Sequence, residues 1–117
     1  MTTEGALGEP QIIRIPENTF EYPLHLMLNL LAHEMIHVSQ KTKENLIEDK
    51  NEREWQAYYE MLFHKIYPQI PNLPKHQLLF FANKALSYYT KMGENSDLQI
   101  KYALQKQEVD TFVASLS

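Results

Sequence analysis

The chain has 117 residues, 44% hydrophobic and 22% charged, which is the ordinary composition of a single globular domain covering residues 1–117. Its net charge of −4 at pH 7 gives no bulk attraction to nucleic acid or to an anionic membrane. No apolar run could cross a bilayer, and no signal peptide is visible. We therefore expect a cytoplasmic protein that binds neither nucleic acid nor membrane. Cysteine is absent, so any metal site must use nitrogen and oxygen ligands.

The N-terminal part of the chain predicts one short strand followed by a long helix. Residues 1–10 are polar, contain two glycines and are expected to be loose. Residues 11–15 (QIIRI) are rich in β-branched side chains and end at Pro16, which is typical of a strand at a sheet edge. A helix is then expected over about residues 20–41, with Pro23 early enough to be tolerated.

The rest of the chain predicts three more helices. A polar loop over residues 42–50 leads to a second helix, residues 50–67, which Pro68 ends. A third helix is expected over residues 74–92 and a last one over residues 96–114. The predicted fold class is mainly α (α+β), with about four helices and one short N-terminal edge strand.

The first predicted helix carries the residues on which the functional prediction depends. His33-Glu34-Met35-Ile36-His37 has the pattern H-E-x-x-H. On an α-helix the two histidines are about one turn and about 6 Å of rise apart, so both imidazoles leave the same face. Their nitrogens can close on one Zn²⁺ per chain at about 2.0–2.1 Å each. Glu34 flanks that position and can take a proton from an activated water without being a ligand.

The surroundings of the motif strengthen this interpretation. The same stretch is apolar almost all round the helix, through Leu30, Leu31, Ala32, Met35, Ile36 and Val38. Such a helix is expected to be buried, and a buried helix carries histidines and a glutamate only where their polar atoms are satisfied. The alternative is a pair of core histidines that are hydrogen-bonded to their neighbours and bind no metal.

A catalytic zinc usually has three protein ligands and one open position, so the two histidines need a partner. The second predicted helix offers Glu52, Glu54 and Glu60. Glu52 and Glu54 differ by about 200° around a helix, so only one of them can face the metal. We favour Glu54, because the small Ala57 one turn later lets this helix approach the motif helix closely. The alternatives are Glu52 as the ligand, or glutamates that only solvate an exposed face.

The segment HEMIHVSQ followed by REWQAYY resembles the gluzincin clan of zinc metallopeptidases, over about residues 12–61. It is most similar to the small single-domain minigluzincins and to the catalytic core of the CAAX-prenyl-type endopeptidases. This resemblance implies a zincin-like domain in which His33, His37 and Glu54 hold the zinc and Glu34 is the general base.

The resemblance also implies a role for the predicted strand. Residues 12–15 would be the edge strand beside the cleft, where an extended peptide could add by β-augmentation. The chain differs from many relatives at Tyr58, where an acidic residue usually supports a histidine ligand. Gln40 could orient the ring of His37 instead, or could belong to a solvated helix end. Asn29 could support the site or pack between helices.

The predicted function is zinc-dependent hydrolysis of a peptide or protein substrate, with a metal-activated water and Glu34 as general base. The alternative is a catalytically inactive or latent zincin-like module that binds or assists another protein. The small size of the chain and the single strand before the motif helix favour that alternative. The sequence predicts no particular oligomeric state.

Overall fold

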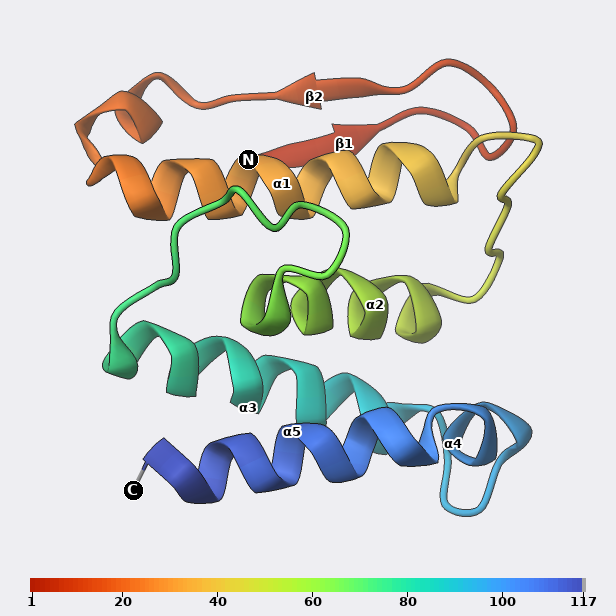
Figure 1. Cartoon of the computed structure of the whole chain (residues 1–117). Coiled ribbons are helices and arrows are strands. Elements are labelled where there is room, and N and C mark those ends of the chain that lie inside the picture. Colours follow the sequence, from red (N-terminus) through yellow and green to blue (C-terminus); the bar gives the residue numbers. More distant parts are fainter. Residues whose placement is uncertain (117) are drawn as a thin grey trace.

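The computed structural model describes residues 1–116. They form five α-helices, one 3₁₀ helix and a small antiparallel sheet, joined by loops. The elements are β1 (Thr2–Glu4), β2 (Ile12–Arg14), α1 (Leu24–Gln40), α2 (Lys50–Phe63), α3 (Lys75–Lys91), α4 (Asp97–Lys101) and α5 (Ala103–Leu116). The predicted fold class, mainly α with a small β component, is confirmed. The hairpin lies along one side of α1, α2 lies along the other side, and α3 and α5 follow beyond α2 (Figure 1). Within residues 1–116, no helix combines the length and apolar composition that a bilayer span requires.

The β-hairpin is the main departure of the fold from the sequence prediction. Residues 1–10 contain β1, so the prediction that they are loose is wrong, and the sheet has two strands instead of one. β1 pairs antiparallel with β2, and Thr3 lies opposite Ile13. The three polar residues of β1 carry no apolar alternation that would mark a strand. Pairing with β2 and contact with α1 hold the segment in place.

The motif helix α1 is shorter than predicted at its start. A 3₁₀ helix, Glu17–Glu21, precedes it, and Tyr22 is extended with φ −74° and ψ 152°. The residue before a proline is pushed out of the α region, so the 3₁₀ helix cannot continue into α1. Pro23 therefore stands at the N-cap, and α1 begins at Leu24 instead of Phe20.

The end of α2 also differs from the prediction, because the helix stops at Phe63 and not at Tyr67. His64 adopts the left-handed conformation with φ 47°. The buried carboxylate of Glu60 accepts hydrogen bonds from the backbone N–H groups of Ile66 (2.9 Å) and Tyr67 (2.8 Å). These bonds turn the chain back against the last turn of α2 before Pro68 is reached.

Asn29 packs between elements and does not support the motif. Its side chain is fully buried, donates to the carbonyl oxygens of His25 (2.7 Å) and Pro71 (2.9 Å), and contacts His64 Nε2 through Oδ1 at 2.6 Å. Asn29 therefore joins α1 to the segment after α2. Of the two roles that the sequence allowed, support of the site or packing between elements, the structure shows the second.

The last predicted helix is broken into α4 and α5 at Tyr102, which has φ −102° and ψ 15°. Ser96 caps α4, because its hydroxyl accepts the N–H of Gln99 at 3.2 Å. The buried Tyr102 hydroxyl donates to Glu52 Oε2 (2.6 Å) and accepts from Gln56 Nε2 (2.7 Å). Both partners lie on α2, so a tertiary contact is made at the residue where the helix breaks.

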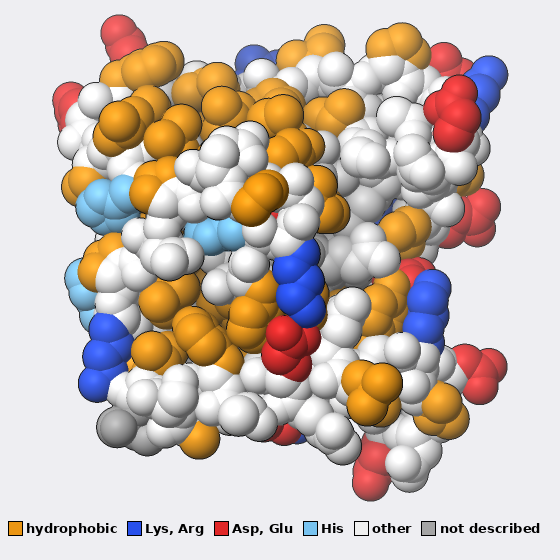
Figure 2. All heavy atoms as spheres, in the orientation of Figure 1, with side chains coloured by type: hydrophobic (Ala, Val, Ile, Leu, Met, Phe, Trp, Pro, Cys, Tyr) orange, Lys and Arg blue, Asp and Glu red, His pale blue; other side chains and the backbone are white. Residues whose placement is uncertain are grey.

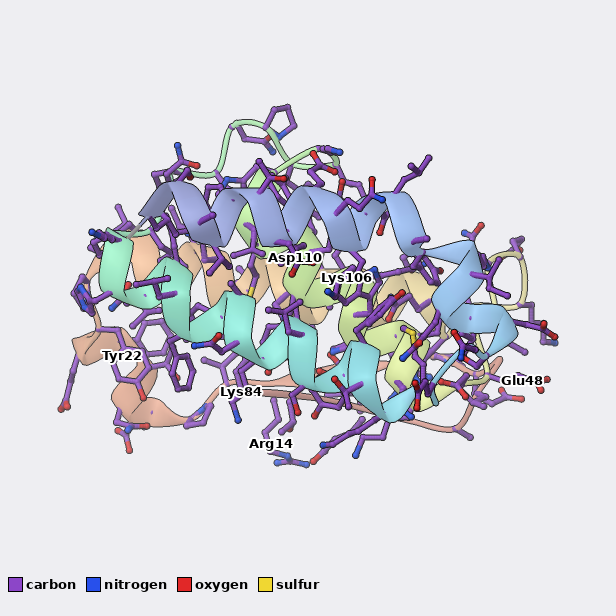
Figure 3. All side chains as sticks on the ribbon, turned by 90° about the horizontal axis from the view of Figure 1, so that it is seen from below. Arg14, Tyr22, Glu48, Lys84, Lys106 and Asp110 are labelled. Carbon is purple, nitrogen blue, oxygen red and sulfur yellow. The ribbon has the colours of Figure 1, made fainter. Side chains whose placement is uncertain are left out.

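The core lies around α2, which packs between α1 and α3. Trp55 on α2 is fully buried, with the ring of Tyr89 5.3 Å away and its indole N–H donating to Gln105 Oε1 at 3.0 Å. Seen from below, α3 and α5 run side by side under this core (Figure 3). Apolar side chains also gather on the surface over the upper part of the molecule (Figure 2), and exposed members of the N-terminal segment include Ile12, Phe20 and Leu24.

The Trp55 contacts give a stability prediction. We expect Trp55→Ala to lower the free energy of unfolding by about 3–5 kcal/mol, because it removes a large buried side chain and leaves a cavity. Leu104→Ala, at an 80% exposed position, is the control and should cost about 0.5 kcal/mol or less. Urea unfolding followed by far-UV circular dichroism measures both. Equal losses in the two variants would contradict the placement of the core.

Candidate metal centre

Two buried histidines on α1 face one carboxylate on α2. The His33 and His37 Nε2 atoms are 3.1 Å apart. Glu54 reaches them from α2, with Oε1 2.9 Å from His37 Nε2 and Oε2 3.7 Å from His33 Nε2. The i, i+4 spacing places both imidazoles on the α1 face that packs on α2, so α1–α2 packing assembles the cluster. The structure thus brings together the three residues that the sequence singled out as ligands.

Glu52, the alternative third ligand, points away from the histidines. Its Oε2 accepts from Lys101 Nζ at 2.7 Å and from the Tyr102 hydroxyl at 2.6 Å. The backbone N–H of Glu52 donates to Asp49 Oδ1 at 2.9 Å, and this hydrogen bond caps the start of α2. Glu52 and Glu54 therefore point to different sides of α2, as helical geometry predicts, and Glu54 is on the side of the histidines.

The donor set matches the geometry of a tetrahedral metal ion. Ligand atoms about 2.0–2.1 Å from Zn²⁺ in a tetrahedron lie about 3.3 Å from one another. The two Nε2 atoms are 3.1 Å apart, and the two oxygens of Glu54 lie close to that spacing, with Oε1 2.9 Å from His37 Nε2 and Oε2 3.7 Å from His33 Nε2. Two imidazoles and one carboxylate could thus hold a divalent ion and leave a fourth position for water or substrate.

His37 is set up to offer its Nε2 lone pair. Its Nδ1 lies 3.0 Å from Gln40 Oε1. The Gln40 amide nitrogen donates to the carbonyl oxygen of Arg53 at 3.0 Å, and a carbonyl can only accept, so the oxygen of Gln40 must face His37. His37 therefore carries a proton on Nδ1, which leaves Nε2 either to bind a metal ion or to hold a second proton toward Glu54. Gln40 therefore orients the ring of His37 and does not belong to a solvated helix end.

A directional chain of hydrogen bonds continues from Gln40 into the core. Gln40 Nε2 also donates to Gln56 Oε1 at 3.0 Å, and Gln56 Nε2 donates to the Tyr102 hydroxyl at 2.7 Å. That hydroxyl donates to the carboxylate of Glu52, which cannot donate in return. Every donor in the chain is thereby fixed in one direction, from His37 to Glu52.

His33 has a different environment. Its Nδ1 is buried and has no hydrogen-bond partner among residues 1–116. The ring of Tyr58 packs against it with the two centroids 4.5 Å apart. The His33 ring is therefore held by packing and not by a hydrogen bond from Nδ1.

Glu34 lies beside the cluster and is held by the hairpin. The Thr3 hydroxyl lies 2.9 Å from Glu34 Oε1 and 3.1 Å from its backbone oxygen. A side-chain ligand atom from each of His33, Glu34 and His37 lies within 4.8 Å of the others, so Glu34 could also reach an ion. Glu54 Oε1 lies 2.9 Å from His37 Nε2 and the carboxylate of Glu34 is engaged by Thr3, which favours Glu54 as the third ligand.

Thr3 is the contact that the sequence analysis missed. A weak signal was present, because Thr2 and Thr3 are β-branched and are separated from residues 11–15 by a segment containing Gly5 and Gly8. Such a pattern is compatible with a hairpin that has a long loop.

A cleft of about 440 Å³ opens over the cluster. It is lined by Met1, Thr2, Thr3, His33, Glu34, His37, Lys41, Lys50, Arg53, Glu54 and Tyr58. The strand that borders it is β1, whereas residues 12–15 do not line it. The expectation that the strand at residues 12–15 lies beside the cleft is therefore wrong, because the unexpected strand β1 lies there instead.

The residues of the cluster shift one another's pKa values. Burial alone would raise the pKa of Glu54, but hydrogen bonds from His33 and His37 outweigh burial and hold it well below its usual range. Burial alone would lower the pKa of His37, but its hydrogen bond to Glu54 and the Glu54 charge raise it above its ordinary value. Burial, with the charge of Glu54, raises the pKa of Tyr58 to about 12, so that its hydroxyl stays protonated at neutral pH.

Comparisons of the chain with protein-family models, with curated proteins and with solved structures gave no match. His64 stands apart from this site, because its ring contacts Asn29 and Asn72.

The geometry predicts how zinc binding depends on the two candidate glutamates. We expect one Zn²⁺ per chain in the wild type, a loss of stoichiometric zinc in Glu54→Ala, and retention in Glu52→Ala, because only Glu54 faces the histidines. Elemental analysis after gel filtration measures the zinc content. Zinc that survives in Glu54→Ala but is lost in Glu52→Ala would move the third ligand to Glu52.

The shifted pKa values predict the pH dependence of the metal-free protein. The lowered pKa of Glu54 contributes stability above about pH 4.5 that is lost as the pH falls through its folded value. The raised pKa of His37 contributes stability below about pH 6.5 that is lost as the pH rises through its folded value. The contribution of the pair to the free energy of unfolding should therefore be largest between about pH 4.5 and 6.5 and should decline as the pH rises further, through the raised pKa of His37. Urea unfolding of chelated protein should show this decline, and Glu54→Gln should abolish it.

Proposed function

We propose that the protein is a zinc-dependent metallopeptidase. The single observation that carries the proposal is the convergence of His33, His37 and Glu54 at separations suited to one tetrahedral ion, with the Glu34 carboxylate beside them. A Zn²⁺ ion bound there would act as a Lewis acid toward water and a peptide carbonyl.

The side chains around the cluster have complementary tasks in this proposal. Glu34 takes a proton from the attacking water and passes it to the leaving amine nitrogen, as a general base and then a general acid. The Gln40 side chain keeps the proton of His37 on Nδ1, away from the reacting groups. Tyr58 lines the cleft with a protonated hydroxyl, which can donate a hydrogen bond to the substrate. An extended peptide would lie along β1, the strand that borders the cleft.

A second candidate function is a latent or non-catalytic zincin-like module. The observation that favours it is the hydrogen bond between Thr3 and Glu34, because it engages the carboxylate that would have to accept a proton. If this bond suppresses activity, Thr3→Ala should raise the rate of peptide cleavage by the zinc-loaded protein. If neither the zinc-loaded wild type nor the zinc-loaded Thr3→Ala variant cleaves any peptide, the result would support the non-catalytic function.

The role of Glu34 gives the test of the first proposal. Glu34→Gln should keep the zinc and the helical content, because Glu34 is not needed as a ligand. It should lose about 10²- to 10⁴-fold in kcat toward a peptide that the wild type cleaves, since general-base catalysis contributes that much. His37→Ala is the comparison and should lose the zinc itself. Full activity of Glu34→Gln would remove this mechanism, and a zinc loss like that of His37→Ala would make Glu34 a ligand.

A further inference from the structure

One end of the cleft over the candidate metal centre is lined by three cations. Lys41 follows α1 directly, and Lys50 and Arg53 lie in the first turn of α2. The loop that joins α1 to α2 brings these positions to the same end of the two helices (Figure 1). We call these three residues the cation-lined end of the cleft.

None of these three side chains is paired with a carboxylate among residues 1–116. Lys41 Nζ reaches only the carbonyl oxygen of Thr3, at 3.4 Å. The exposed Lys50 side chain has no bonded partner within the described residues. By contrast, Arg14 and Lys101 each form an ion pair within the chain.

Arg53 is held in place without being neutralised. One guanidinium nitrogen, Nη1, donates to the carbonyl oxygens of Ile47 (2.9 Å) and Glu48 (2.7 Å). These bonds use uncharged acceptors, so the positive charge remains available, and the half-buried side chain is already ordered. A fixed guanidinium offers further N–H groups in a planar fork that suits a carboxylate.

The position of these cations on α2 is electrostatically unfavourable for the helix. A helix N-terminus carries a partial positive charge, which favours acidic side chains in the first turn and disfavours Lys50 and Arg53 there. The acidic Glu52 of the same turn faces the other way and is neutralised by Lys101. A chain with a net charge of −4 thus concentrates positive charge at this one end of its cleft. Such a departure from local preference is typical of a functional site.

We propose that the cation-lined end binds a carboxylate of the substrate, either an acidic side chain or a free C-terminal carboxylate, close to the peptide bond that meets the candidate metal centre. This inference rests on the proposed function, because it names the substrate class of the same cleft. At the metal centre, two charges on Zn²⁺ would be balanced by Glu34 and Glu54. The charges of Lys41, Lys50 and Arg53 would then remain for the substrate to neutralise.

Equilibrium binding tests this inference without requiring cleavage. The zinc-loaded Glu34→Gln protein is titrated into fluorescent peptides of one sequence that differ only in charge. One peptide is neutral with a C-terminal amide, one has an internal glutamate and the amide, one is neutral with a free C-terminal carboxylate, and one has an internal lysine. At least one carboxylate peptide should bind about 10-fold or more tightly than the neutral peptide, and the lysine peptide should bind most weakly. The preferred carboxylate identifies the source, side chain or chain terminus.

Matched variants assign the preference to the cation-lined end. Lys50→Gln and Arg53→Gln should each reduce the ratio of affinities for carboxylate and neutral peptides. Lys50→Gln removes no side-chain hydrogen bond or ion pair among residues 1–116, so it should leave the fold undisturbed. Arg14→Gln makes the same change of charge at the only other arginine, which lies on β2, does not line the cleft and projects into solvent (Figure 3), and should leave the ratio unchanged.

Equal affinity for neutral and carboxylate peptides would overturn the inference, and so would a preference that Lys50→Gln leaves intact. Repeating the titration with metal-free protein tests the carboxylate preference independently of the proposed peptidase activity. A carboxylate preference that depends on Lys50 but accompanies no zinc binding and no cleavage would retain the binding site and remove the peptidase. Cleavage of neutral and acidic peptides at equal kcat/KM, with equal affinity in the titration, would retain the peptidase and remove the carboxylate site.

Discussion

The structure depends most on the close approach of the His33 and His37 Nε2 atoms, which point at one another in a buried site 3.1 Å apart. Two lone pairs cannot face each other at that distance without a proton or a cation to share. Glu54 supplies the opposite charge from α2, at 2.9 Å from His37. Either a protonated histidine or a metal ion would satisfy the three groups, and their separations match a tetrahedral ion. The packing of α1 on α2 is therefore tied to the chemistry of the cluster.

The cluster is connected to the rest of the fold through hydrogen bonds of fixed direction. The chain from His37 through Gln40 and Gln56 ends at Tyr102, where the last predicted helix breaks into α4 and α5. The break places the Tyr102 hydroxyl where it can donate to Glu52. Tyr102, at the junction of the C-terminal helices, therefore supports the tautomer of His37, which lies 65 positions earlier in the chain. The same hydrogen bonds fix the position of α2 relative to α1 and the C-terminal helices.

Much of the site followed from the sequence, because helical periodicity alone determines which residues share a face. The spacing of His33 and His37 and the rotation between Glu52 and Glu54 needed no tertiary information. The elements that the sequence did not predict are those held by tertiary contacts. β1 is too short and polar to carry a pattern of its own, and the break at Tyr102 depends on partners about 50 residues away on α2. The contact of Thr3 with Glu34 was missed for the same reason, since it exists only because the hairpin packs on α1.

The most direct measurement of the central claim is X-ray absorption at the zinc edge, on protein loaded with one equivalent of Zn²⁺. We expect a four-coordinate shell of nitrogen and oxygen at about 2.0–2.1 Å, with the outer scattering of two imidazoles from His33 and His37. The His37→Ala protein, loaded in the same way, should lose this signature. A six-coordinate oxygen shell without imidazole scattering, or a spectrum that His37→Ala leaves unchanged, would contradict the account.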